Sequence, residues 1–254
     1  MKLSKLFFAM VALVPALAFA NSQTIPLDHV EDRSNDKVAL QNGAKLFVNY
    51  CLNCHAATAM RYNRLRDIGL NEEQIKTNLL FTGEKVGDLM KTALSPKDAK
   101  EWFGAVPPDL SVIARAKASA AGSGADWLYT YLRSYYKDDA RPTGWNNLLF
   151  PNVGMPHVLW ELQGVRSANI VIQDDPHDSS KIVHKFIGYE KVSDGKMTAT
   201  EYDHAVTDLV AYLQWMGEPT QNTRKRLGVI VLIFLSILAF LAWRLNASYW
   251  KEVK

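Results

Sequence analysis

Three stretches of the chain carry apolar residues at the three- and four-residue spacing of an amphipathic helix. The stripes are Val38, Ala39, Leu46, Phe47 and Tyr50; Trp127, Leu128, Tyr131, Leu132 and Tyr135; and Val206, Leu209, Val210, Leu213 and Met216, the last closed by Gly217 and Pro219. Each stripe predicts a helix with one face in the core, and the first helix leads directly into a pair of cysteines. A shorter helical pattern is predicted around Val86, Leu89, Met90 and Ala93.

Between residues 157 and 196 the pattern changes to short runs of β-branched and aromatic residues. Residues 170–172 and 182–187 are such runs, and Ser193-Asp194-Gly195 is a turn signal. They predict a small β insertion. The fold class is therefore mainly α, with this insertion added.

Residues 227–243 are 17 residues without a charge, and they span roughly 26 Å as a helix. Three basic residues flank each end, so charge alone does not orient the segment. A buried core helix is the alternative, but such a helix would carry a polar stripe, and this run is apolar on every side. We predict a transmembrane anchor over residues 223–245.

The N-terminus has the pattern of a secretory signal peptide over residues 1–20. Lys2 and Lys5 precede an apolar run of about a dozen residues, and Ala18-Phe19-Ala20 resembles a cleavage site. A first membrane helix is disfavoured because the run is shorter than the ~20 residues needed to span. Export of residues 21–222, followed by stop-transfer at the anchor, places residues 246–254 in the cytoplasm.

The exported part is acidic although the whole chain carries a net charge of +3. Eight of the 29 basic residues and one of the 26 acidic residues lie outside residues 21–220. This segment therefore has 21 basic and 25 acidic residues and a net charge of −4. An acidic domain suits electrostatic capture of a basic soluble partner, and ordinary solubility explains the same charge equally well.

Cys51-Leu52-Asn53-Cys54-His55 is the chemical centre of the sequence, and its cysteines are the only two in 254 residues. C-x-x-C-H binds a c-type haem through two thioethers and one imidazole. A zinc site needs four ligands and the chain has no second cysteine pair, while a thioredoxin-like pair expects a βαβ context. We therefore predict one covalently bound haem c, with His55 as an axial ligand.

A sixth iron ligand is expected unless the protein is a haem enzyme or a gas sensor with an open site. The candidates after signal removal are Met60, Met90, Met155, Met197, Met216, His29, His157, His177, His184 and His204. Met155 lies in an irregular loop between two prolines and beside a glycine, far from His55 in sequence, which favours it. Methionine fills cores more often than it binds iron, so this pattern alone leaves the choice open.

Five further blocks of sequence lie in a characteristic order: Val106-Pro107-Pro108-Asp109-Leu110-Ser111, Ile113-Ala114-Arg115-Ala116, Gly154-Met155-Pro156, the stretch from Met60 to Leu65, and Leu213 to Pro219 leading through Arg224-Lys225-Arg226 into the anchor. With them the chain closely resembles the cytochrome c1 family of bacterial ubiquinol:cytochrome c oxidoreductases, which implies a haem domain in the periplasm and an anchor in the bacterial inner membrane. The resemblance covers essentially the whole mature chain. Some members add a disulfide, for which this chain has no cysteines left.

The resemblance implies a cytochrome c-like haem domain with Met155 as sixth ligand, Arg115 paired with a haem propionate, and Pro107 and Pro108 packed at the haem edge. It implies electron transfer from a Rieske iron–sulfur subunit to a cytochrome c acceptor, in a complex with cytochrome b and membrane lipid, with no nucleic acid and no substrate bond chemistry of its own. The alternative is a free-standing, membrane-anchored cytochrome that shuttles electrons to a terminal oxidase.

Overall fold

The computed structural model describes residues 25–175 and 178–252; the predicted signal peptide lies outside this part of the chain. The helices are α2 Lys37–Leu46, the π-helix η1 Phe47–Cys51, the 3₁₀ helix η2 Tyr62–Ile68, α3 Glu72–Asn78, α4 Pro96–Phe103, α5 Ile113–Ala116, α6 Gly124–Arg133, α7 Trp160–Gln163, α8 Ala199–Gly217 and α9 Gln221–Tyr249. The strands are β1 Ala57–Arg61, β2 Leu89–Met90, β3 Tyr135–Lys137, β4 Trp145–Asn147, β5 Gly164–Asp175 and β6 Asp178–Asp194. The mainly α class with a β insertion is confirmed.

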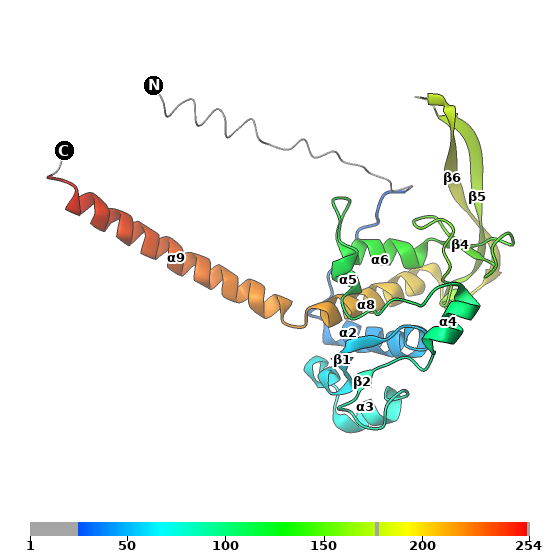
Figure 1. Cartoon of the computed structure of the whole chain (residues 1–254), viewed down its shortest axis with the longest axis horizontal. Helices are drawn as coiled ribbons and strands as arrows, with labels where there is room; N and C mark the ends of the chain where they lie inside the picture. Colours follow the sequence, from blue (N-terminus) through cyan, green and yellow to red (C-terminus); the bar gives the residue numbers. More distant parts are fainter. Residues whose placement is uncertain (1–24, 176–177, 253–254) are drawn as a thin grey trace.

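The core of the body is built on α2, α6 and α8, the helices that the three apolar stripes predict (Figure 1). Their buried faces meet in one hydrophobic cluster that also takes in η1 and η2. Phe47 of η1 packs on Tyr212 of α8, with ring centroids 5.5 Å apart and both side chains fully buried. The cluster fixes the end of α2, where the cysteine motif begins.

Gly43 allows α2 and α8 to approach closely. A Cβ atom at this position would lie 2.1 Å from the carbonyl oxygen of Asp208, so no side chain fits there. The buried carboxylate of Asp208 also accepts hydrogen bonds from Arg33 at 2.5 Å and from Asn42 at 3.1 Å. This crossing places the cysteine motif beside the apolar face of α8.

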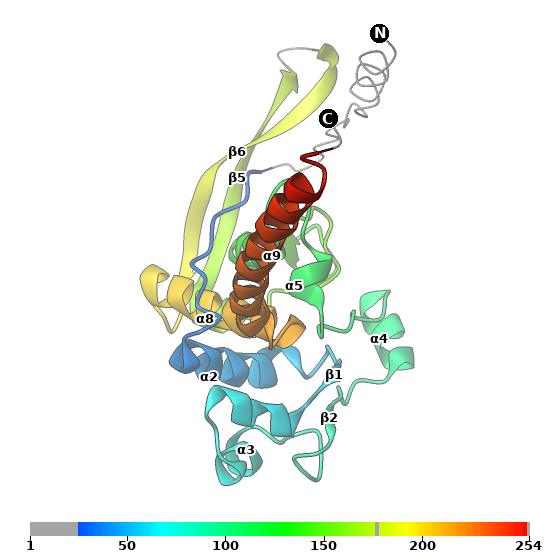
Figure 2. The same ribbon diagram turned by 90° about the vertical axis from the view of Figure 1, so that its left-hand side faces the viewer.

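The predicted β insertion is a long antiparallel hairpin, β5–β6, that projects from the body (Figures 1 and 2). Its register runs from Gly164 opposite Asp194 to Asp175 opposite Asp178. At its base, the guanidinium of Arg166 donates to the backbone carbonyls of Arg133 and Tyr135 and lies 3.5 Å from the centre of the Tyr189 ring. The sequence pattern located the two runs but underestimated the length of both strands.

The helix predicted around Met90 is wrong. Leu89 and Met90 form β2, which pairs antiparallel with β1, placing Met90 opposite Ala57. Four apolar residues in eight do not distinguish a short strand from one helical turn. Met90 is fully buried, and the hydroxyl of Tyr212 donates to its sulfur at 3.7 Å.

α9 is the predicted membrane segment. It is long enough to cross a bilayer, and its most apolar 18-residue window has a mean hydropathy of 2.4 and no buried residues. It leaves the body as one isolated helix beyond the end of α8 (Figures 1 and 2). An apolar surface of this size with no protein against it is stable only in lipid or against another protein.

Candidate haem site

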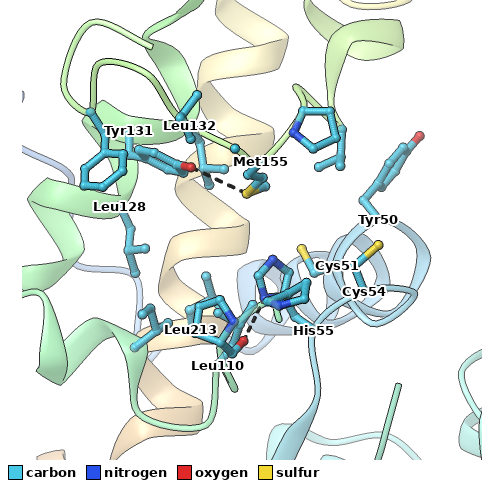
Figure 3. Close-up of a pocket in the computed structure, with 18 of the residues that line it drawn as sticks. Tyr50, Cys51, Cys54, His55, Leu110, Leu128, Tyr131, Leu132, Met155 and Leu213 are labelled. Carbon is cyan, nitrogen blue, oxygen red and sulfur yellow. Dashed lines mark hydrogen bonds between the residues drawn. The ribbon is translucent and has the colours of Figure 1, made fainter. Parts of the chain in front are cut away.

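An apolar cavity of about 380 Å³ opens between the cysteine motif, α6 and α8 (Figure 3). Its lining residues are Tyr50, Cys51, Cys54, His55, Phe103, Ala105, Val106, Pro107, Pro108, Leu110, Ile113, Lys117, Trp127, Leu128, Tyr131, Leu132, Phe150, Val153, Gly154, Met155, Pro156, Val158, Leu209 and Leu213. The cavity thus brings together five of the six predicted site residues: Cys51, Cys54, His55, Pro108 and Met155. Arg115 is not among them.

The two cysteines lie at the end of a helix whose last turn is widened. η1 continues α2 as a π-helix to Cys51, and the backbone amides of Cys54 and His55 both donate to the carbonyl of Cys51. Burial raises the pKa of the Cys51 thiol to about 12 and also raises the pKa of Cys54. Reactive thiols of redox motifs have lowered pKa values, so this environment does not suit a thioredoxin-like pair.

The ring of His55 is held by the proline-rich segment across from it. Its Nδ1 lies 2.7 Å from the carbonyl oxygen of Pro108, which only accepts, so Nδ1 carries the proton. The lone pair of Nε2 is then free for a metal, because a carbonyl on Nδ1 fixes the tautomer of a histidine ligand in this way. Burial lowers the pKa of His55, which keeps the ring neutral.

The proline-rich segment is fastened to β1 by a set of short hydrogen bonds. The Asp109 carboxylate accepts from the amide and the hydroxyl of Thr58 at 2.8 and 2.7 Å, and from the amide of Ser111 at 2.8 Å. The hydroxyl of Ser111 accepts from the amide of Ala59 at 3.0 Å. Pro107 and Pro108 line the cavity as expected, and the carbonyl of Pro108 has a role that the sequence pattern did not indicate.

Met155 faces the same cavity from the side opposite His55 (Figure 3). Its loop has no regular secondary structure, as the two prolines and Gly154 predict. Asn152 adopts a left-handed conformation, with φ of 64°, and its backbone amide donates to Asn146 while Arg141 donates to its side chain and its carbonyl. In the described part of the chain no other methionine lines this cavity.

Aromatic rings support the Met155 loop from behind. His157 is buried and stacks on Tyr135 with centroids 4.8 Å apart, and the Trp145 ring meets it edge-on at 5.1 Å. Its Nε2 donates to the side-chain oxygen of Gln163 at 2.7 Å, and burial lowers its pKa to about 3, so the ring is neutral. His157 does not line the cavity, so we assign it a structural role behind the Met155 loop.

Arg115, which the family resemblance pairs with a propionate, lies outside the cavity, whereas Lys117 lines it. Arg115 is exposed on α5 near Gly217, where its charge helps to lower the pKa of Glu218, although Arg224 contributes more. Lys117 lines the cavity instead, with its ammonium 4.2 Å from the centre of the Trp127 ring. The sequence pattern did not indicate Lys117. Whether Arg115 or Lys117 faces the cavity depends on where the short helix α5 ends, and only the structure shows this.

The residues of this cavity fit a covalently bound haem. The motif supplies two thiols beside an imidazole with a free Nε2, the opposite side supplies a thioether, and apolar side chains fill the space between. Hydrophobic walls with one imidazole and one thioether are the environment of a low-spin, electron-transferring haem. The fold and the site thus define a c-type cytochrome, with α9 as the one helix able to cross a membrane among the residues that the structure describes.

Sequence comparisons identify the family. The model of the Cytochrome C1 family matches residues 31–253. A protein named ammonia monooxygenase gamma subunit from Nitrosomonas europaea is 44% identical over 100% of both chains. Cytochrome c1 of Allochromatium vinosum is 42% identical over 97% of this chain and 96% of its own, and that of Rhodospirillum rubrum is 28% identical over 96% and 95%.

The chain belongs to the cytochrome c1 family. It carries a covalently attached haem c and has the electron-transfer role of cytochrome c1 in the cytochrome bc1 complex. The free-standing shuttle is not favoured. The family and α9 together make it a membrane-anchored protein whose partners are cytochrome b and a Rieske subunit.

Proposed function

We propose that Cys51 and Cys54 bind the haem covalently, that His55 and Met155 are the axial ligands, and that the protein passes single electrons from the Rieske subunit to a cytochrome c acceptor. The observation that carries this proposal is the cavity, where both thiols, the imidazole and the thioether meet. The haem, when bound, supplies a one-electron couple. The chain supplies placement, exclusion of water and ligand strength.

Each wall of the cavity has a separate task in this proposal. The Pro108 carbonyl keeps Nδ1 of His55 protonated and directs Nε2 to the iron position. The apolar side chains of α6 and α8, Leu128 and Leu213 among them, exclude water, which lowers the reorganisation that each electron transfer requires. Lys117 is placed to meet a propionate, while a propionate contact by Arg115 remains a prediction.

We further propose the orientation that the signal peptide and the anchor predict. Residues 1–20 direct export, residues 21–222 form the periplasmic haem domain, residues 223–245 cross the lipid and residues 246–254 lie in the cytoplasm. α9 extends four residues beyond the predicted anchor at its C-terminal end and two at its N-terminal end. Arg224 and Arg244 lie near the two ends of its apolar run, where they would reach the two interfaces. Protease protection of a C-terminal tag in sealed inner-membrane vesicles tests this orientation.

The test of the axial ligands compares two methionines of the same chain. Met155→Leu should abolish the absorption band of iron–methionine ligation, allow carbon monoxide to bind the reduced protein, and lower the midpoint potential, because a thioether favours ferrous iron. Met90→Leu removes a fully buried sulfur that lies outside the cavity, and it should keep the band. A band that survives in Met155→Leu and disappears in Met90→Leu would contradict the assignment.

The position in the electron-transfer chain needs a separate measurement. Purified membranes reduced with a quinol should show haem c reduction only when the Rieske subunit is present and functional. Reduction that persists after the Rieske cluster is lost would instead place this protein on a direct route from another donor. Stable copurification with cytochrome b distinguishes a complex subunit from a shuttle.

A further inference from the structure

Two phenol hydroxyls connect the interior of the protein to the sulfur of Met155. The hydroxyl of Tyr135 donates to the hydroxyl of Tyr131 at 2.7 Å. The hydroxyl of Tyr131 in turn donates to Sδ of Met155 at 3.6 Å (Figure 3). A phenol has one proton to donate. Because the Tyr131 oxygen accepts the hydrogen bond from Tyr135, its own O–H is free to donate to the sulfur.

Ring packing fixes both hydroxyls in place. Tyr131 stacks on Trp127 with centroids 4.8 Å apart and an interplanar angle of 15°, and it meets the edge of Tyr135 at 5.3 Å. Tyr135 is fully buried and stacks on His157. Stacked rings on a helix and a neighbouring strand cannot turn away without losing these contacts, so the donor to the sulfur is preorganised.

We propose that Tyr131 is a positioning residue that holds the sulfur of Met155 and raises the potential of the haem, with Tyr135 orienting its hydroxyl. This inference rests on the proposed ligation by Met155. A thioether that accepts a hydrogen bond on one lone pair gives less electron density to iron through the other. A weaker donor favours ferrous over ferric iron, and second-shell hydrogen bonds act on metal sites in this way.

Tyr131→Phe tests the proposal because it removes the hydroxyl and keeps the stacked ring. We expect the iron–methionine band to remain. The one-electron reduction equilibrium of the purified holoprotein should shift about threefold toward the oxidised form, which is a fall in midpoint potential of about 28 mV at 59 mV per tenfold. Tyr135→Phe should shift the potential in the same direction by less, because it removes only the partner that orients Tyr131.

Tyr129→Phe is the matched control on the same helix. Tyr129 is half-buried, its ring lies 4.5 Å from the guanidinium carbon of Arg133, and it does not line the cavity. It should leave both the band and the potential unchanged. An unchanged potential in Tyr131→Phe, or an equal shift in Tyr129→Phe, would overturn the proposal.

The failure of this inference can be told from the failure of the proposed ligand. If Met155→Leu keeps the iron–methionine band, the ligand assignment is wrong. If Met155→Leu loses the band while Tyr131→Phe keeps both band and potential, only the role of Tyr131 is wrong. Should Tyr131→Phe not accumulate, Tyr135→Phe carries the same test, and an unchanged potential there would overturn the proposal.

Discussion

The two walls that carry the predicted axial ligands are built in different ways. The wall of His55 is held by backbone groups and one carboxylate, with the carbonyl of Pro108 on the ring and Asp109 fastening the segment to β1. The wall of Met155 is held by stacked rings, by asparagine side chains around its loop and by two phenol hydroxyls. One wall is fixed by hydrogen-bond geometry, and the other mainly by packing.

This difference matches what each ligand has to do. Imidazole is a strong ligand with a definite tautomer, which a single carbonyl sets. A thioether is a weak ligand on a flexible side chain, so its position depends on the surrounding packing. We therefore expect changes in the His55 wall to affect haem attachment and the tautomer, and changes in the Met155 wall to affect the potential and the stability of sixth ligation.

The largest expected effect is loss of both thioethers. Cys51→Ala together with Cys54→Ala should leave almost no haem-loaded protein in membranes, because the haem fills the cavity and its contact area contributes ~25 cal/mol per Å². Haem staining of denaturing gels checks this, with Met90→Leu as a variant that keeps both thiols. Normal covalent haem in the double variant would end the assignment of a c-type site.

Next in size is the removal of a ring from the Met155 wall. His157→Ala leaves a cavity beneath Tyr135 and deprives Gln163 of its partner, so the free energy of unfolding should fall by about 2 to 4 kcal/mol. The iron–methionine band should then disappear on heating before the haem domain unfolds. His204→Ala, an exposed position on α8, should change stability by about 0.5 kcal/mol or less. A stable His157→Ala with an unchanged band would show that packing does not hold this wall.

The sequence predicted the His55 wall far better than the Met155 wall. The thiols and the imidazole lie within five residues, so their spacing alone carries the chemistry. Met155 lies 100 residues beyond His55; its irregular loop favoured it, but the resemblance to a family was needed to settle the choice among the methionines and histidines. The three apolar stripes predicted α2, α6 and α8 because amphipathic periodicity reflects which face is buried.

Other features were not predictable because they depend on tertiary contacts. The short strand β2 exists because β1 lies beside it, and nothing local distinguishes it from a helical turn. The length of the β5–β6 hairpin depends on pairing between residues that the alternation pattern covers only in part. The choice of Lys117 over Arg115 as the cation in the cavity depends on the direction in which the short helix α5 ends.

A smaller effect should separate these two cations. Lys117→Met keeps an apolar stem over Trp127 and removes the charge, so the potential should fall by roughly 20 to 60 mV, a two- to tenfold change, because a nearby cation favours the ferrous state. Arg115→Met removes an exposed charge next to Glu218 and should leave the potential unchanged. Redox titration of both variants decides between them. A fall confined to Arg115→Met would support the propionate pair that the family resemblance implies.

The smallest expected effect concerns the carboxylate that fastens the His55 wall. Burial raises the pKa of Asp109, but hydrogen bonds from Ser111 and Thr58 outweigh it and bring the pKa below its ordinary value of 3.8. A carboxyl whose pKa is lower in the folded state contributes its full stabilisation at pH values above its pKa in the unfolded chain. This contribution is lost as the pH falls through its pKa in the folded protein. Asp109→Asn should therefore lower the free energy of unfolding at pH 7 by about 1 kcal/mol, at the low end for a charged hydrogen bond because the residue is exposed.

The pH dependence distinguishes this cause from a loss of shape. The stability difference between wild type and Asp109→Asn should close as the pH falls below 3.8, because protonation removes the same charge from the wild-type protein. Thermal unfolding of the holoprotein from pH 7 to pH 3 measures this difference. Thr58→Val removes one donor and keeps the carboxylate, so its stability difference from wild type should depend less on pH than that of Asp109→Asn. A difference that stays constant over this range would mean that Asp109 acts through packing, so the His55 wall would resemble the Met155 wall more closely than its hydrogen bonds indicate.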